Sequence, residues 1–191
     1  MASGSLSASA PAVVDEGISG NRLLNNSDCF GVSALARFER DALSQPGVKD
    51  VVLLEGINDI GLSEVADGGC FAPSNSSVSA AQIEAGDQEL INMAHARGVR
   101  IFAGTLTPFL GSAAINGGNY GTACGEALRE AVNTWIRTSH AFDGVIDFSR
   151  VIQDPYAPRY LNPAYNSGDS LHPNDLGYEV MAAAIPLRLV R

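Results

Sequence analysis

Four short apolar runs, separated by longer segments with helical periodicity, constrain the fold of this chain most. The runs occupy residues 12–14, 51–54, 100–103 and 145–148. Runs of this length that are apolar throughout are typical of strands buried on both faces of a sheet. Strands that alternate with helices predict an α/β fold, in which helices cover both faces of a parallel sheet.

The segments between the runs carry helix signals. Ser79 and Gln82 have the spacing of a capping box, in which each side chain bonds to the other residue's backbone. Asn174 is a suitable N-cap for a last helix after Pro173. From these caps and the spacing of apolar residues we expect four helices, at residues 33–43, 79–97, 122–137 and 175–184.

Length and composition fit one soluble globular domain, since the chain has 191 residues, of which 46% are hydrophobic and 17% charged. We expect a domain at residues 12–191 and a small, polar tail at residues 1–11. The net charge is −9 and the 12 Lys and Arg residues form no basic cluster, so no nucleic-acid partner is expected. No apolar run is long enough to span a bilayer, and the N-terminus lacks the features of a signal peptide. The sequence therefore indicates no localisation.

The three cysteines are widely spaced and show no metal-ligand pattern, so neither a metal nor another cofactor is expected. They are Cys29, Cys70 and Cys124. One disulfide with one free thiol and three free thiols are both consistent with the sequence.

Residues that could take part in catalysis or binding follow each of the predicted strands. The carboxyl ends of parallel strands lie at one edge of the sheet, and α/β proteins place their functional loops there. We therefore expect a single functional edge. Two glycine-rich segments, 67–79 and 111–121, leave the same edge and can form a wall over it. The loops that carry the candidate residues are 17–21, 56–59, 105–108 and 168–175.

Asp169 lies three residues before His172, and Pro173 restricts the backbone directly after the pair. A histidine that acts as general base in acyl transfer needs a carboxylate that orients its ring and stabilises the imidazolium. We predict that the Asp169 carboxylate bonds to Nδ1 of His172. The alternative is a surface histidine that caps the last helix.

Gly20 and Asn58 can supply the donors of an oxyanion hole. A glycine in a tight turn lets a backbone N–H point into a cleft, and the Asn58 amide can donate into the same space from the next loop. We predict that the two donors converge near His172. The alternative is that both residues serve only their turns. Asp59 is expected to be structural and to bond to backbone amides of its own loop.

On these residues the sequence resembles the SGNH hydrolases, the GDSL-type lipases and esterases. Residues 17–24 are similar to the family's Gly block, 56–59 to its Asn block and 169–174 to its Asp-x-x-His block. The resemblance extends from about residue 13 onward and is closest to bacterial, often secreted, esterases. It implies a flavodoxin-like, three-layer α/β/α sandwich and the hydrolysis of small-molecule esters through a serine acyl-enzyme, without a metal.

The family's nucleophile block is the part that this sequence does not reproduce. In the family the serine follows the first strand, and a long helix separates it from the Gly block. Only about twenty residues precede Gly20, which is too few for two strands, a turn and a helix. Ser5, in the Gly-Ser-Leu of residues 4–6, partly resembles the motif and is the first nucleophile candidate, and Ser19 is the second. We expect the family's first strand to be missing or replaced.

If this strand is missing, more than one arrangement of the sheet and more than one function are consistent with the sequence. Residues 3–10 can fill the gap, the next strand can shift inward, or another chain can donate a strand, which would make the protein a homo-oligomer. Two functions remain. One is a serine esterase of small acyl or acetyl esters, including carbohydrate esters. The other is a non-catalytic remnant that binds esters or sugars without efficient turnover.

Overall fold

The computed structural model describes residues 12–63 and 77–186. The expected tail at residues 1–11, the nucleophile candidate Ser5 and most of the glycine-rich segment 67–79 lie outside the described residues. Within the described ranges, no helix combines the length and the apolar composition that crossing a bilayer requires.

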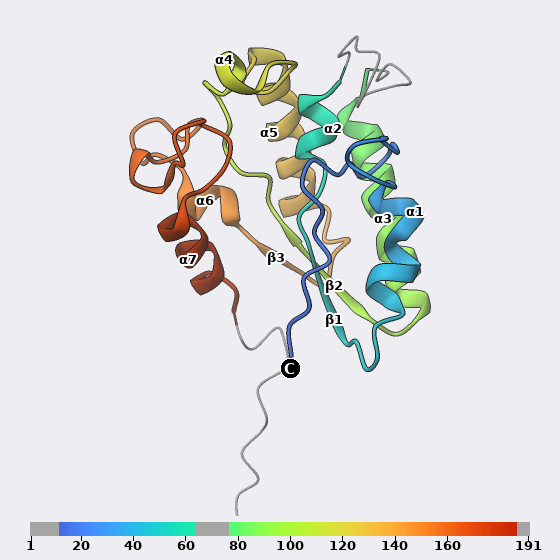
Figure 1. Ribbon diagram of the computed structural model, residues 1–191. Coiled ribbons are helices and arrows are strands. Elements are labelled where there is room, and N and C mark those ends of the chain that lie inside the picture. The colour runs from blue at the N-terminus through green and yellow to red at the C-terminus, as the bar shows by residue number, and fades with distance from the viewer. Residues whose placement is uncertain (1–11, 64–76, 187–191) are drawn as a thin grey trace, which may run out of the picture.

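A parallel sheet lies at the centre of the fold (Figure 1). Strand β2 is the middle strand, and Phe102 on it lies beside Val52 of one neighbour and Gly144 of the other. The three strands are β1 (Asp50–Leu53), β2 (Arg100–Gly104) and β3 (Gly144–Ile146).

Three of the four expected helices form close to their predicted bounds, and residues 33–43 form a short α-helix that continues as a π-helical turn. The Ser79–Gln82 capping box is present, since the Ser79 N–H donates to Gln82 Oε1 at 2.9 Å and the Gln82 N–H donates to Ser79 Oγ at 3.3 Å. Asn174 caps the last helix by accepting from the Gly177 N–H at 2.9 Å. The helical elements are α1 (Ala34–Phe38), η1 (Glu39–Leu43), α2 (Ile57–Gly61), α3 (Ala80–Ala96), α4 (Ala113–Asn116), α5 (Ala123–Thr138), α6 (Phe148–Ile152), η2 (Pro163–Tyr165) and α7 (Asp175–Ala183).

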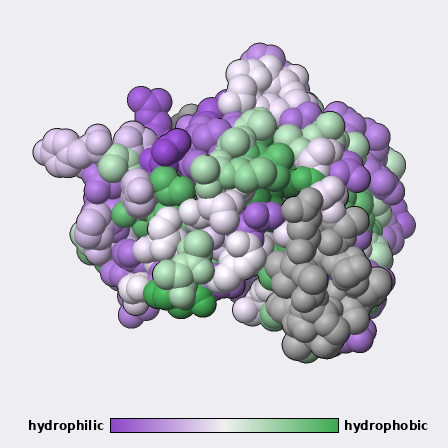
Figure 2. Space-filling model, turned by 90° about the horizontal axis from the view of Figure 1, so that it is seen from above, coloured by the Kyte–Doolittle hydropathy of each residue, from purple (hydrophilic) through white to green (hydrophobic). Residues whose placement is uncertain are grey.

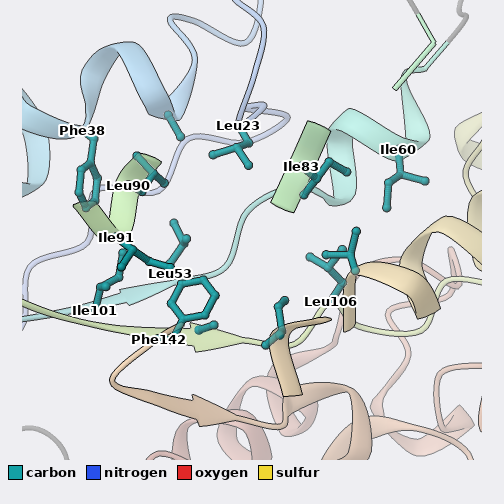
Figure 3. Close-up of a cluster of buried hydrophobic side chains, with 14 of the residues drawn as sticks. Leu23, Phe38, Leu53, Ile60, Ile83, Leu90, Ile91, Ile101, Leu106 and Phe142 are labelled. Atoms are coloured by element: carbon teal, nitrogen blue, oxygen red, sulfur yellow. The ribbon is translucent and has the colours of Figure 1, made fainter. Parts of the chain in front are cut away.

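Helices cover both faces of the sheet. On one face, Leu53 and Ile101 belong to a large buried cluster with residues of α1, α3 and α5. Figure 3 shows part of this cluster, with Leu90 of α3 and Phe38 of α1 on the side of the sheet that these strand residues face. On the other face, Phe102 packs with residues of α6 and α7 in a second cluster. This arrangement confirms the predicted α/β fold with a helix-covered parallel sheet.

The strand expected at residues 12–14 is not formed, so that prediction was wrong. Val13 is 91% exposed, and the segment makes no ladder with the sheet. An apolar triplet offers few ladder hydrogen bonds and little apolar area to offset the entropy of ordering it. Among the described residues, β1 is therefore the outermost strand on its side, and Val52 and Leu54 are 39% and 40% exposed.

Candidate functional site

The Asp169 carboxylate contacts His172 as predicted. Asp169 Oδ1 accepts hydrogen bonds from the N–H groups of Leu171 at 2.9 Å and His172 at 2.8 Å. Asp169 Oδ2 lies 2.6 Å from Nδ1 of His172. The loop turns tightly here, with Ser170 at φ +62° and Gly168 at φ +112°. The backbone thus fixes one carboxylate oxygen, which leaves the other aimed at the imidazole.

The environment of Asp169 favours its charged form. Partial burial opposes ionisation, but hydrogen bonds from the His172 ring and from two backbone N–H groups outweigh it, so the pKa of Asp169 lies well below its ordinary value. An ionised carboxylate at Nδ1 accepts its proton, and the neutral ring then presents a lone pair at Nε2. The His172 side chain is 57% exposed, and within the described ranges Nε2 has no hydrogen-bond partner. The pair can therefore accept a proton from a group outside it.

Gly20 occupies a tight turn in the left-handed region, at φ +74°, closed by a hydrogen bond from the Asn21 N–H to the Ile18 carbonyl at 3.0 Å. A Cβ at this position would lie 2.2 Å from Cδ1 of Phe30, so only glycine fits. No acceptor for the Gly20 N–H is found in residues 12–63 and 77–186. The turn is as predicted, but no strand precedes it among the described residues from 12 onward.

The Asn21 side chain holds this turn, a role that the sequence analysis missed. Its Nδ2 donates to the carbonyls of Phe30 at 2.7 Å and Val32 at 2.9 Å, and its Oδ1 accepts from Nε of Arg37 at 3.0 Å. Asn21 is buried. Three hydrogen bonds to a buried amide fix the backbone on which Gly20 stands.

Asn58 lies in the first turn of α2 rather than at the end of a strand, because Gly56 at φ +107° turns the chain from β1 into the helix. Its Nδ2 donates to the Asn21 carbonyl at 2.8 Å, and its Oδ1 accepts from the Tyr120 hydroxyl at 2.6 Å. The structure therefore brings the Gly20 turn and the Asn58 amide side by side.

Asp59 is structural, but the prediction that it bonds to its own loop was wrong. Its Oδ2 accepts from the Leu23 N–H at 2.7 Å and its Oδ1 from the Leu24 N–H at 2.9 Å. Asp59 is 1% exposed, and burial raises its pKa although these two hydrogen bonds act in the opposite direction. The side chain thus ties the segment after Gly20 to α2.

Arg37 of α1 links the segment before Gly20 to the segment before α2. Arg37 donates to the Glu16 carbonyl at 2.6 Å and lies 3.4 Å from Oε1 of Glu55. Burial raises the pKa of Glu55 to about 7, and the nearby Arg37 guanidinium reduces the effect. Glu55 was not singled out from the sequence, since nothing in its local pattern indicates that a charged residue after β1 is partly buried.

The Asp169–His172 pair and the Gly20–Asn58 pair lie on loops that one segment connects. Asn116 Nδ2 donates to the Asp169 carbonyl at 3.3 Å, and the Asn119 N–H donates to the Gly61 carbonyl at the end of α2 at 2.8 Å. In Figure 2, which looks down on the end of the molecule where α2 and α4 lie in Figure 1, apolar surface lies among polar side chains. Within the described ranges no hydrogen bond joins the two pairs directly, so their convergence on one point stays a prediction.

Within residues 12–63 and 77–186, His172 makes no hydrogen bond to a candidate nucleophile. Ser5 lies outside the described residues, and Ser19 is an exposed residue within the turn that contains Gly20. No serine hydroxyl of the described segments bonds to Nε2 of His172.

Two further observations concern the cysteines and metals. Cys29 is disulfide-bonded and Cys124 is an exposed free thiol. The alternative in which all three cysteines are free thiols is therefore excluded. In the part of the chain that the structure describes, no group of three or more His, Cys, Asp or Glu side chains is arranged to hold a metal ion.

Solved structures with the same fold include known ester hydrolases. The chain is similar to a GDSL-like lipase from Bacteroides thetaiotaomicron, with 18% identity and a TM-score of 0.64 over 92% of this chain and 74% of that one. It is also similar to an acetylxylan esterase from Geobacillus stearothermophilus, with 21% identity and a TM-score of 0.61 over 92% of this chain and 70% of that one. At these identities the likeness shows the fold alone.

Sequence comparison gives the family. No match was found among curated proteins. The model of the GDSL-like lipase/acylhydrolase family matches residues 4–180, which is most of the chain and includes all the blocks described above. The chain therefore belongs to the GDSL-like lipase/acylhydrolase family, a family of carboxylic ester hydrolases.

Proposed function

We propose that this protein is a serine-type ester hydrolase that acts on small acyl or acetyl esters. The observation that carries the proposal is the 2.6 Å contact between Asp169 Oδ2 and His172 Nδ1, which leaves Nε2 free to act as general base. Family membership supports ester hydrolysis as the reaction type. An acetylxylan esterase is among the solved structures with this fold, and we include acetylated carbohydrate among the proposed substrates.

In the proposed mechanism, a serine Oγ attacks the ester carbonyl while His172 Nε2 takes the hydroxyl proton. The oxyanion that forms accepts hydrogen bonds from the Gly20 N–H and from Asn58 Nδ2. Collapse of the tetrahedral intermediate breaks the bond to the alcohol, which leaves with the proton from His172. Water then repeats the sequence on the acyl-enzyme and releases the acid. Ser5 is the proposed nucleophile.

A second candidate is a remnant that binds esters or sugars without efficient turnover. Within the described residues no serine hydroxyl bonds to His172, and this observation favours it. A site without its nucleophile retains only a small part of the catalytic power of a complete triad, on the order of a thousandfold to ten-thousandfold over water.

Labelling with a serine-directed phosphonate, followed by mass spectrometry, separates the two candidates. The esterase predicts a single adduct on Ser5 and a burst of p-nitrophenol from p-nitrophenyl acetate, both lost in Ser5→Ala and His172→Ala. An adduct on Ser19 would move the nucleophile to that residue. If no serine is labelled and wild type releases p-nitrophenol no faster than His172→Ala, the esterase proposal is wrong.

The same assay tests whether a partner chain completes the site. If another copy supplies the missing strand or the nucleophile, the specific rate falls as the protein is diluted to monomer. A specific rate that is independent of protein concentration contradicts completion of the site in trans.

A further inference from the structure

The Asn58 amide is held between groups from two distant segments. Its Nδ2 donates to the Asn21 carbonyl at 2.8 Å, and its Oδ1 lies 2.6 Å from the Tyr120 hydroxyl. A backbone carbonyl can only accept, so the Asn58 atom that faces Asn21 is the amide nitrogen. The amide oxygen therefore faces Tyr120, and the hydroxyl must be the donor in that contact.

Tyr120 is itself fixed in place. The side chain is buried, and its ring meets Phe109 edge-on, with centroids 6.4 Å apart and an interplanar angle of 78°. A Cβ on Gly61 would lie 2.1 Å from Cε1 of the ring, so the glycine in α2 makes the space that Tyr120 fills. The neighbouring Asn119 N–H donates to the Gly61 carbonyl at 2.8 Å. The hydroxyl consequently has one position, against Asn58.

The surroundings keep the phenol protonated. Burial, with a smaller effect from the Asp59 carboxylate, raises the pKa of Tyr120 above its ordinary value, while Arg22 acts in the opposite direction. A protonated hydroxyl can donate, as the contact with Asn58 Oδ1 requires.

One N–H of the Asn58 amide remains for a ligand. The amide nitrogen carries two protons, and within the described residues only the Asn21 carbonyl accepts one. We propose that Tyr120 is a positioning residue that fixes the Asn58 side chain so that its second N–H points at the oxyanion. The role as stated rests on the proposed ester hydrolysis, because only an acyl intermediate supplies that oxyanion.

Loss of the hydroxyl would leave the amide less well oriented. The terminal torsion of an asparagine side chain has a broad energy profile, so one bond to Asn21 alone does not determine its angle. Donors stabilise a transition state only when they already point to where the charge develops. Tyr120→Phe keeps the ring against Phe109 and Gly61 and removes only the donor.

The first test measures the environment of the Asn58 side-chain amide by NMR and does not require the protein to turn over a substrate. In the full chain labelled with 15N, the Asn58 side-chain amide signals are identified by their loss in Asn58→Asp. Tyr120→Phe is expected to shift these signals more than any other Asn or Gln side-chain pair. The matched control is Tyr156→Phe, since Tyr156 is 97% exposed, and this variant should leave the Asn58 signals unchanged. Unchanged Asn58 signals in Tyr120→Phe would overturn the proposal.

The second test uses p-nitrophenyl acetate. Tyr120→Phe should lower kcat about tenfold and leave KM within about twofold, a smaller loss than the hundredfold or more expected for removing the donor itself. The double variant Asn58→Ala/Tyr120→Phe should be no slower than Asn58→Ala, because Tyr120 acts only through Asn58. A raised KM with unchanged kcat, or losses that add, would contradict the role.

The two proposals fail in different ways. If wild type hydrolyses p-nitrophenyl acetate no faster than His172→Ala, the esterase proposal is wrong, and the amide signals alone then decide whether Tyr120 orients Asn58. If hydrolysis depends on His172 but Tyr120→Phe changes neither kcat nor the Asn58 signals, the esterase stands and the role of Tyr120 is refuted.

Discussion

Asp59 Oδ2 accepts a hydrogen bond from the Leu23 N–H at 2.7 Å, and this contact joins two residues 36 positions apart. The second oxygen of the same carboxylate accepts from the Leu24 N–H at 2.9 Å. One buried side chain thus satisfies two backbone donors of the segment that follows Gly20, and it does so from the residue next to Asn58. The relative position of the two candidate oxyanion donors depends on this link.

Asp59→Ala is expected to destabilise the protein by about 2–4 kcal/mol, because it leaves two N–H groups without their acceptor at a site that is 1% exposed. Urea unfolding measures the change. Asp28→Ala, at an exposed position, is the matched control and should stay within about 0.5 kcal/mol of wild type. Equal stability of the two variants would show that the Asp59 hydrogen bonds contribute little.

Glu55 should make stability depend on pH. Its pKa in the folded state is raised from 4.5 to about 7, so the folded protein keeps a proton that the unfolded chain releases between these values. The free energy of unfolding therefore falls as the pH rises through this window, by at most about 3.5 kcal/mol at about 1.4 kcal/mol per unit. Glu55→Gln removes the titration, so its stability should fall less than that of wild type between pH 5 and pH 8, measured by chemical unfolding. Parallel pH profiles for the two proteins would exclude the effect.

Asp169→Asn should change the tautomer of His172. Asn Oδ1 can still accept from the Leu171 and His172 N–H groups, but the atom facing Nδ1 becomes an amide donor. Nδ1 then accepts and the proton of the neutral ring moves to Nε2, which can no longer act as a base. Hydrolysis that depends on His172 should fall about a thousandfold or more. The 15N chemical shifts of the imidazole report the tautomer, and Asp175→Asn is a control that should leave them unchanged.

Gly61→Ala should destabilise the protein by about 1–3 kcal/mol, although alanine is favoured over glycine within a helix. The added Cβ would lie 2.1 Å from Cε1 of Tyr120 and must displace its ring. In a Tyr120→Ala background the clash is absent, and the same substitution should be neutral or stabilising. A cost that persists in that background would place the strain elsewhere.

Local features of the site and fold were predictable from the sequence. Asp169 and His172 are three residues apart, and so are Ser79 and Gln82 in the capping box, so one turn of chain brings each pair together. The parallel sheet followed from the alternation of apolar runs with helices. The strand predicted at residues 12–14 did not form, since apolar composition alone supplies neither length nor a pairing partner.

The long-range contacts of the site could not be predicted from the sequence. Tyr120 and Asn58 are 62 residues apart, and Asn58 and Asn21 are 37 apart. Their pairing depends on where α2 and the segment before α5 pack, and no local pattern encodes it. Asp59 was assigned a structural role correctly, but its partners were misplaced for the same reason.

The register of the parallel sheet also bears on how the chain reaches this structure. Asp50 pairs with Arg100 and Phe102 with Gly144, so each strand pairing closes a loop of about 40–50 residues before any ladder hydrogen bond forms. Strands β1, β2 and β3 all run in the same direction, so neither pairing between them can form early as a hairpin. A chain of this contact order is expected to refold more slowly than a helical bundle of equal length, and stopped-flow refolding would measure the difference.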